Sequence, residues 1–202
     1  MKTKILSLLI IITLGVSLNS CKKEVKKADA IQYSIEPKTT TINWTAYKTT
    51  DKVPVKGVFK TVNVTNTVSS TNPFEAVNNL KFSIPVNSID SKDETRDAKL
   101  INSFFGSMKD TKNLIGKINL GEKGRGSIDL TMNGITTKLP ITYIISGQLA
   151  EINATLNLDN WKAQLAIKTL NKVCNEKHKG DDGISKTWNE VNIHIVSYLK
   201  AE

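Results

Sequence analysis

Short runs of alternating apolar and polar residues, separated by turn residues, constrain this chain to an antiparallel β fold. The clearest run lies between residues 126 and 147, where apolar and polar positions alternate on both sides of Asn133-Gly134. Asn and Gly tolerate the positive φ values that a two-residue primed turn requires. The segment is therefore predicted to be a β-hairpin.

The same alternation predicts short strands along most of the remaining chain. The further predicted strands are Thr39–Ala46, Val53–Val64, Phe82–Val86, Leu114–Leu120, Glu151–Leu158 and Trp188–Tyr198. Residues 65–79 are polar and are interpreted as a connection, whereas 161–174 fits either a short helix or a strand. Seven to nine such strands predict an all-β antiparallel barrel or sandwich, and alternation alone does not separate the two.

One amphipathic helix is predicted within this series of strands, over residues 94–105. Its apolar positions recur at helical spacing, and Gly106 is a suitable stop. The apolar positions are Ala98, Leu100, Ile101, Phe104 and Phe105. Arg96 and Asp97, near the start of this helix, are predicted to form a structural ion pair that holds the helix over the β structure.

Four motifs in sequential order resemble the YceI-like family, and the resemblance extends from Tyr33 to Ser197. They are Ile42-Asn43-Trp44, Val55-Lys56-Gly57-Val58-Phe59, Ser88-Ile89-Asp90 followed by Arg96-Asp97, Leu100 and Phe104-Phe105, and Leu130 to Thr136. The resemblance implies an elongated lipocalin-like barrel, whose better-described members hold a long isoprenoid or another amphiphilic chain. Lys99 departs from the pattern, because many relatives have His there.

The N-terminal segment resembles a bacterial lipoprotein signal. A charged start and an apolar run too short to span a membrane lead to small residues before Cys21. Residues 1–20 are thus predicted to be removed, residues 21–30 to form a lipidated tether, and residues 31–202 to form one domain. The alternative is an ordinary secretory signal with an incidental cysteine. A lipidated Cys21 would anchor the protein in the cell envelope, on the periplasmic side or the outer-membrane surface.

The charge distribution argues against nucleic-acid binding. The chain carries +9, of which residues 1–30 supply six Lys against one Glu and one Asp, so the predicted domain carries +5. This excess comes without a basic run or an aromatic platform. Contact with a negatively charged membrane surface remains compatible with it. The sequence leaves the oligomeric state open, a dimer included.

Few residues in the domain suggest catalysis or metal binding, and we expect a protein that is not an enzyme. Cys174, Glu176 and His178 could ligate a metal, but structural zinc needs four ligands and catalytic zinc usually three. Cys174 and His178 could act as nucleophile and base, although nothing in the sequence positions them. No metal site, catalytic residue or cofactor is predicted, apart from a bound isoprenoid or acyl lipid.

The resemblance favours an apolar cavity inside the barrel, although each candidate lining residue could equally be ordinary core. The candidates are Trp44, Phe59, Phe82, Ile84, Leu100, Phe104, Phe105, Met108, Met132 and Trp161. Arg96 and Lys99 are the candidates for polar contacts at its mouth. The sequence thus predicts an envelope lipoprotein that binds or sequesters a long-chain amphiphile of isoprenoid or fatty-acyl type. The alternative is a non-enzymatic interaction or stress scaffold with a packed barrel.

Overall fold

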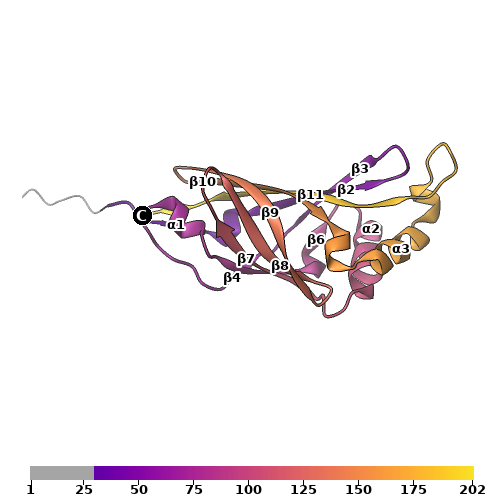
Figure 1. Ribbon diagram of the computed structural model, residues 1–202, viewed down its shortest axis with the longest axis horizontal. Coiled ribbons are helices and arrows are strands. Elements are labelled where there is room, and N and C mark those ends of the chain that lie inside the picture. The colour runs from indigo at the N-terminus through magenta and orange to yellow at the C-terminus, as the bar shows by residue number, and fades with distance from the viewer. Residues whose placement is uncertain (1–29) are drawn as a thin grey trace, which may run out of the picture.

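The computed structural model describes residues 30–202, and the predicted signal, Cys21 and the tether up to residue 29 lie outside them. The described chain is mostly β-structure (Figure 1). Its longer strands are β2 (Thr41–Lys48), β3 (Val53–Phe59), β7 (Asn113–Leu120), β8 (Arg125–Met132), β9 (Ile135–Ser146), β10 (Leu149–Asn157) and β11 (Thr187–Tyr198). The shorter ones are β1 (Tyr33–Ser34), β4 (Asn63–Val64), β5 (Lys81–Pro85), β6 (Ile89–Asp90) and β12 (Lys200–Ala201).

The main sheet curls until its two ends meet. Hydrogen-bonded neighbours follow the order β4-β5-β7-β8-β9-β10-β11-β2-β3-β6. β3 continues into β4 along the chain, β5 continues into β6, and these two stretches run antiparallel, with Val58 opposite Asp90 and Val64 opposite Phe82. The two ends of the order therefore join along one seam, as the predicted lipocalin-like barrel requires. A barrel of this size either fills with side chains or holds one small ligand.

The seam is irregular at its centre for a local reason. Pro85 has no amide proton to donate to a ladder, and β5 ends at this residue. The 3-10 turn η2 (Val86–Ser88) follows, after which β6 resumes pairing with β3. The seam is thus paired at both ends and interrupted in the middle.

The predicted hairpin and the predicted helix are both present. β8 and β9 pair around the turn at Asn133 and Gly134, whose φ values are 53° and 67°. The predicted helix is divided into α2 (Glu94–Lys99), the π-helical turn η3 (Leu100–Phe104) and the 3-10 turn η4 (Phe105–Ser107). Two further helices are α1 (Pro73–Val77), within the predicted connection, and α3 (Gln164–Val173), within the segment for which helix and strand were both compatible.

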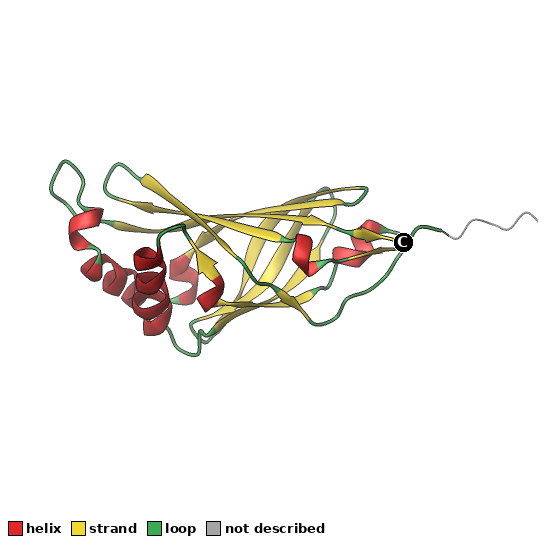
Figure 2. Ribbon diagram, turned by 180° about the vertical axis from the view of Figure 1, so that it is seen from behind, coloured by secondary structure: helices red, strands yellow, loops and turns green. Residues whose placement is uncertain are grey.

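Helices α2 and α3 gather at one end of the elongated barrel, and the C-terminus lies at the other (Figures 1 and 2). Phe105 of η4 packs against Phe59 of β3, with ring centroids 6.4 Å apart, so that the helical cover contacts the barrel wall. At the opposite end β1 pairs with β12, and residue 30 therefore emerges beside the C-terminus. In residues 30–202 there is no helix with the length and apolarity needed to cross a bilayer.

Candidate functional site

Two apolar cavities follow one another along the inside of the barrel. The central cavity, of about 100 Å³, lies beneath the helical cover. The far cavity, of about 60 Å³, lies toward the end that holds the C-terminus. The central cavity is lined by Trp44, Ala46, Phe59, Ile89, Leu100, Phe104, Phe105, Leu114, Met132, Leu156, Leu158, Leu170, Thr187, Trp188, Val191 and Ile193.

Strand periodicity explains why the two cavities lie in series. Inward-facing residues recur at every second position of a strand. On β2, Trp44 lines the central cavity and Ile42 the far one, and on β11 Ile193 and Ile195 divide in the same way. The inner face of the barrel therefore presents two apolar spaces in series, with packed side chains between them.

Most of the predicted cavity residues lie around these two spaces. Six of them line the central cavity, namely Trp44, Phe59, Leu100, Phe104, Phe105 and Met132. Phe82 and Ile84 line the far cavity. Met108 and Trp161 are instead buried in the core outside both linings, and the Trp161 indole donates a hydrogen bond to the Leu130 carbonyl over 2.9 Å.

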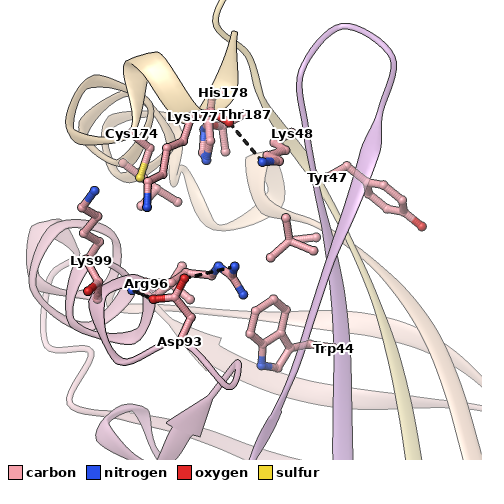
Figure 3. Close-up of a pocket in the computed structure, with 15 residues that line it drawn as sticks. Trp44, Tyr47, Lys48, Asp93, Arg96, Lys99, Cys174, Lys177, His178 and Thr187 are labelled. Carbon is pink, nitrogen blue, oxygen red and sulfur yellow. Dashed lines mark hydrogen bonds and ion pairs between the residues drawn. The ribbon is translucent and has the colours of Figure 1, made fainter. Parts of the chain in front are cut away.

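A third cavity of about 100 Å³ opens at the helical end and has charged side chains around it (Figure 3). We call its charged and titratable rim (Lys48, Asp93, Arg96, Lys99, Lys177 and His178) the polar mouth. It shares lining residues with the central cavity, among them Trp44, Ala46 and Leu100. The polar mouth therefore adjoins the apolar central cavity.

Arg96 is held at the mouth by the loop that begins α2. Its Nη2 lies 3.3 Å from Asp93 Oδ2, and its Nη1 donates to the Ser91 carbonyl over 3.2 Å. The predicted ion pair with Asp97 is wrong, because Asp97 instead accepts hydrogen bonds from the amide and hydroxyl of Ser91. Asp93 is the helix N-cap, so its carboxylate already lies beside the first turn and within reach of the guanidinium.

His178 lies in η6 (Asn175–His178), where its Nδ1 is 2.7 Å from the Thr187 hydroxyl. Burial, followed by the nearby positive charges of Lys48 and Lys99, lowers the pKa of His178 to about 4. The imidazole is therefore neutral at physiological pH.

The possible metal ligands considered from the sequence do not converge. Cys174 lines the mouth cavity together with His178, but Glu176 forms an ion pair with Lys179 at 2.7 Å. Within residues 30–202, no three His, Cys, Asp or Glu side chains are close enough together to hold a metal ion. His194, the second histidine, is exposed on β11.

The structure adds two mouth residues that the sequence did not single out. Lys48 comes from the end of β2 and Lys177 from η6, far apart in the chain. Lys48 Nζ donates to the Lys177 carbonyl over 3.1 Å, so the two segments meet at the mouth. Only barrel closure brings them together, and the one local signal was the proximity of Lys177 to Cys174 and His178.

The carboxylate of Asp90 supports the seam of the barrel. Asp90 ends β6, and its Oδ2 lies 3.0 Å from the ammonium groups of both Lys60 and Lys92. A hydrogen bond from the Lys92 amide, followed by these two ammonium groups, holds the pKa of Asp90 far below its ordinary value. Asp90 is thus a structural carboxylate rather than an acid or a base.

Comparison with known proteins identifies the fold. No functionally curated protein matches the sequence. A polyisoprenoid binding domain from Saccharophagus degradans has a similar structure, with a TM-score of 0.56 and 12% identity over 86% of this chain and 99% of that one. BcnA of Burkholderia cenocepacia is similar with a TM-score of 0.54 and 16% identity, over 83% and 99% of the two chains. At these identities the likeness concerns the fold.

The family model for the YceI-like domain matches residues 33–196, which contain the helical cover and the barrel except for the last two residues of β11. The motifs at Trp44, Gly57 and Asn133-Gly134 all lie within this match. The chain therefore belongs to the YceI-like domain family.

Proposed function

We propose that this protein binds or sequesters a long-chain apolar or amphiphilic molecule, of isoprenoid or fatty-acyl type, inside its barrel. The observation that carries the proposal is the series of apolar spaces inside the barrel, which are the cavity at the polar mouth, the adjoining central cavity and the far cavity. The name of the Saccharophagus relative, a polyisoprenoid binding domain, supports the same class of ligand.

Burial of the chain would supply the affinity. Each methylene transferred from water to an apolar interior contributes about 0.8 kcal/mol. The present cavities hold only a short apolar segment, so a longer chain needs the side chains at the constrictions to rotate. Leu100 and Phe104 line the central cavity and belong to the π-helical turn η3, a type of irregularity common at functional sites.

We also propose that Cys21 carries the lipid that anchors the protein in the cell envelope. The charged start, the apolar run and the small residues before Cys21 support this. The first described residue lies at the end of the barrel opposite α2 and α3 (Figure 1). An anchor attached there would leave the polar mouth at the end away from the attachment point.

The test is native mass spectrometry of residues 30–202 purified from a bacterial host, followed by organic extraction. These residues contain the closed seam and the whole family match. We expect an added mass that extracts as an isoprenoid or acyl lipid. A protein that carries no lipid and takes up none when offered farnesol or palmitate would support the packed scaffold instead. Radiolabelled palmitate incorporation, lost in Cys21→Ala, tests the anchor separately.

A further inference from the structure

The seam of the barrel, where β3–β4 meets β5–β6, is joined by few residue pairs. β3 and β6 share two pairs, and β4 and β5 share two more. By contrast, β8 and β9 share eight pairs, and β10 and β11 share nine. Because the paired residues supply the hydrogen bonds that close the barrel, the wall separates more readily at the seam than between those strands.

The middle of the seam forms its hydrogen bonds largely on its own side. The Val86 amide donates to the Lys112 carbonyl over 3.0 Å, and the Ser88 hydroxyl donates to the Pro85 carbonyl over 2.7 Å. One backbone hydrogen bond crosses the seam beside this turn, from the Lys60 amide to the Ser88 carbonyl over 2.9 Å. Separation of the two sides at this point would therefore leave few backbone groups to be paired again by water.

Both apolar cavities of the barrel border the seam. Phe59 and Ile89 pair across it and line the central cavity. Val64 and Phe82 pair across it nearer the other end and line the far cavity. A long chain that entered lengthwise from the polar mouth would have to pass the side chains packed between the two cavities. A chain that entered through the seam would reach both cavities at once.

An ion pair joins the two sides of the seam. Lys60 Nζ, on the β3 side, lies 3.0 Å from Asp90 Oδ2 at the end of β6. The Lys60 side chain is 64% exposed, so the pair is weak enough to break and form again in water. Lys92, the second ammonium group beside Asp90, follows it in the chain and lies on the same side of the seam.

We propose that the seam is the entry site of the apolar ligand. The two stretches β3–β4 and β5–β6 separate, the chain enters the barrel sideways, and the ladder pairs and the Lys60–Asp90 ion pair then form again behind it. This inference rests on the proposed function and specifies the route by which the same ligand reaches its cavities.

A disulfide across the seam tests this route. Asn63 and Ser83 lie directly opposite each other on β4 and β5, and neither lines the far cavity. Opposite residues of antiparallel strands have Cα atoms about 4.5–5.5 Å apart, a separation that a disulfide spans. The seam variant is therefore Asn63→Cys with Ser83→Cys. The matched control is Thr131→Cys with Thr136→Cys, which joins β8 to β9 at an exposed pair whose hydroxyl oxygens are 2.7 Å apart.

Stopped-flow fluorescence with cis-parinaric acid, a fatty acid that becomes fluorescent when it is buried, measures the rate of ligand entry. The oxidised seam variant should take up the probe at least about tenfold more slowly than the same protein after reduction, because a covalent link replaces bonds that break reversibly. The control variant should take up the probe at the wild-type rate in both states. Mass spectrometry verifies each disulfide, and the buried Cys174 is present in every protein.

Two lysine variants test the ion pair across the seam. Lys60→Gln removes the pair that joins the two sides, and probe uptake should become roughly twofold faster, as expected for an exposed ion pair. Lys92→Gln is the matched control, because it removes the ion pair that Asp90 makes on its own side of the seam. Its uptake should match that of the wild type.

Hydrogen exchange of the wild-type protein gives a second measurement if the seam variant does not fold. The amides of Lys60 and Thr65 donate across the seam, to Ser88 and Lys81. They should exchange at least about tenfold faster than the ladder amides of β8 and β9. Equal protection of the two groups of amides would overturn a seam that opens.

The outcomes separate the entry route from the function on which it rests. Equal rates of uptake by the oxidised and reduced seam variant would overturn entry through the seam and leave the apolar ligand standing. Failure of the wild-type protein to bind either cis-parinaric acid or farnesol would overturn the proposed function, and the entry route with it.

Discussion

Gly57 is required by the close approach of an aromatic ring across the sheet. It pairs with Trp44, and a Cβ atom added to Gly57 would lie 2.3 Å from Cζ2 of the indole and 2.7 Å from the Asp90 carbonyl oxygen. The absence of a side chain at Gly57 lets the indole of Trp44, which lines the mouth cavity, pack closely against β3. Gly57 is thus a point of close approach between β3 and the indole of Trp44.

We therefore expect Gly57→Ala to reduce the free energy of unfolding by about 1–3 kcal/mol, the usual cost of overpacking. Urea denaturation followed by circular dichroism measures it. Gly106→Ala is the matched control, because its added Cβ would meet nothing closer than 3.3 Å. Equal stabilities of Gly57→Ala and the wild type would contradict the packing described for Trp44.

His178 makes the stability of the folded state depend on pH in the acidic range. The pKa of His178 is about 4 in the folded protein and 6.5 in its unperturbed state, so the unfolded chain binds the proton first as the pH falls. The folded state thus loses stability between pH 6.5 and pH 4, and the loss is complete below pH 4. Because the ring is partly exposed, we expect a loss of roughly 1–2 kcal/mol.

The pH dependence can be isolated by substitution. Replacing His178 with Gln should flatten the stability profile between pH 6.5 and pH 4, whereas replacing the exposed His194 with Gln should leave the profile parallel to that of the wild type. Urea titrations at a series of pH values provide the comparison. If His178→Gln kept the wild-type slope, the environment described for this imidazole would be wrong.

Among the secondary-structure elements, the β8–β9 hairpin also connects the helical end to the barrel, through hydrogen bonds of its turn residue Asn133. Asn133 Oδ1 accepts from the Lys109 amide over 2.8 Å, and its Nδ2 donates to the Trp161 carbonyl over 2.9 Å. The backbone amide of Asn133 donates to the Thr111 hydroxyl oxygen. A turn residue therefore links the segment after η4 to η5 (Leu158–Trp161), the turn that precedes α3.

Two substitutions separate the functions of this turn residue. Asn133→Gly keeps the positive φ and loses the side-chain hydrogen bonds, so it should lower the free energy of unfolding by about 1–3 kcal/mol. Asn133→Ala loses the same hydrogen bonds and also disfavours the positive φ. It should therefore lower the free energy of unfolding by about 1 kcal/mol more than Asn133→Gly. Thermal and urea unfolding of the two variants measure the difference. Wild-type stability of Asn133→Gly would show that the hairpin tip does not secure the helical end.

The secondary-structure elements differ in how well the sequence alone predicts them. The hairpin at Asn133-Gly134 was predictable, because its turn chemistry is local. The helix over 94–105 was predictable from its spacing, but its division at Leu100 was not, because the π-helical turn fits Leu100 and Phe104 to the barrel. Residues 161–174 resolve into η5 and α3 only through tertiary contacts such as the burial of Trp161 against β8.

At the scale of the whole molecule, the closure of the barrel is the feature that sequence patterns could not predict. The strands β3–β4 and β5–β6 meet along an interrupted seam, and Pro85 was the only local sign of its irregularity. Closure also brings Lys48 and Lys177 to the mouth beside Arg96 and Lys99. Of the candidate site, the sequence thus indicated six of the sixteen residues that line the central cavity and half of the basic residues at the polar mouth.

The central claim is that the ligand lies inside the barrel. The measurement that tests it most directly is lipid binding by a variant in which a larger side chain separates the mouth cavity from the central cavity. Ala46 lines both the mouth cavity and the central cavity, whereas its neighbour Thr45 lies on the outer face of β2. Ala46→Phe should place a ring between the two cavities, and Thr45→Phe is the matched control. Ala46→Leu, which adds less volume, serves if the larger side chain prevents folding.

We would titrate each protein with farnesol and follow binding by calorimetry, after verifying folding by circular dichroism. The account predicts that Ala46→Phe, or Ala46→Leu in its place, loses at least about tenfold in affinity while Thr45→Phe binds as the wild type does. Unchanged farnesol affinity in the folded Ala46 variants would contradict a ligand inside the barrel.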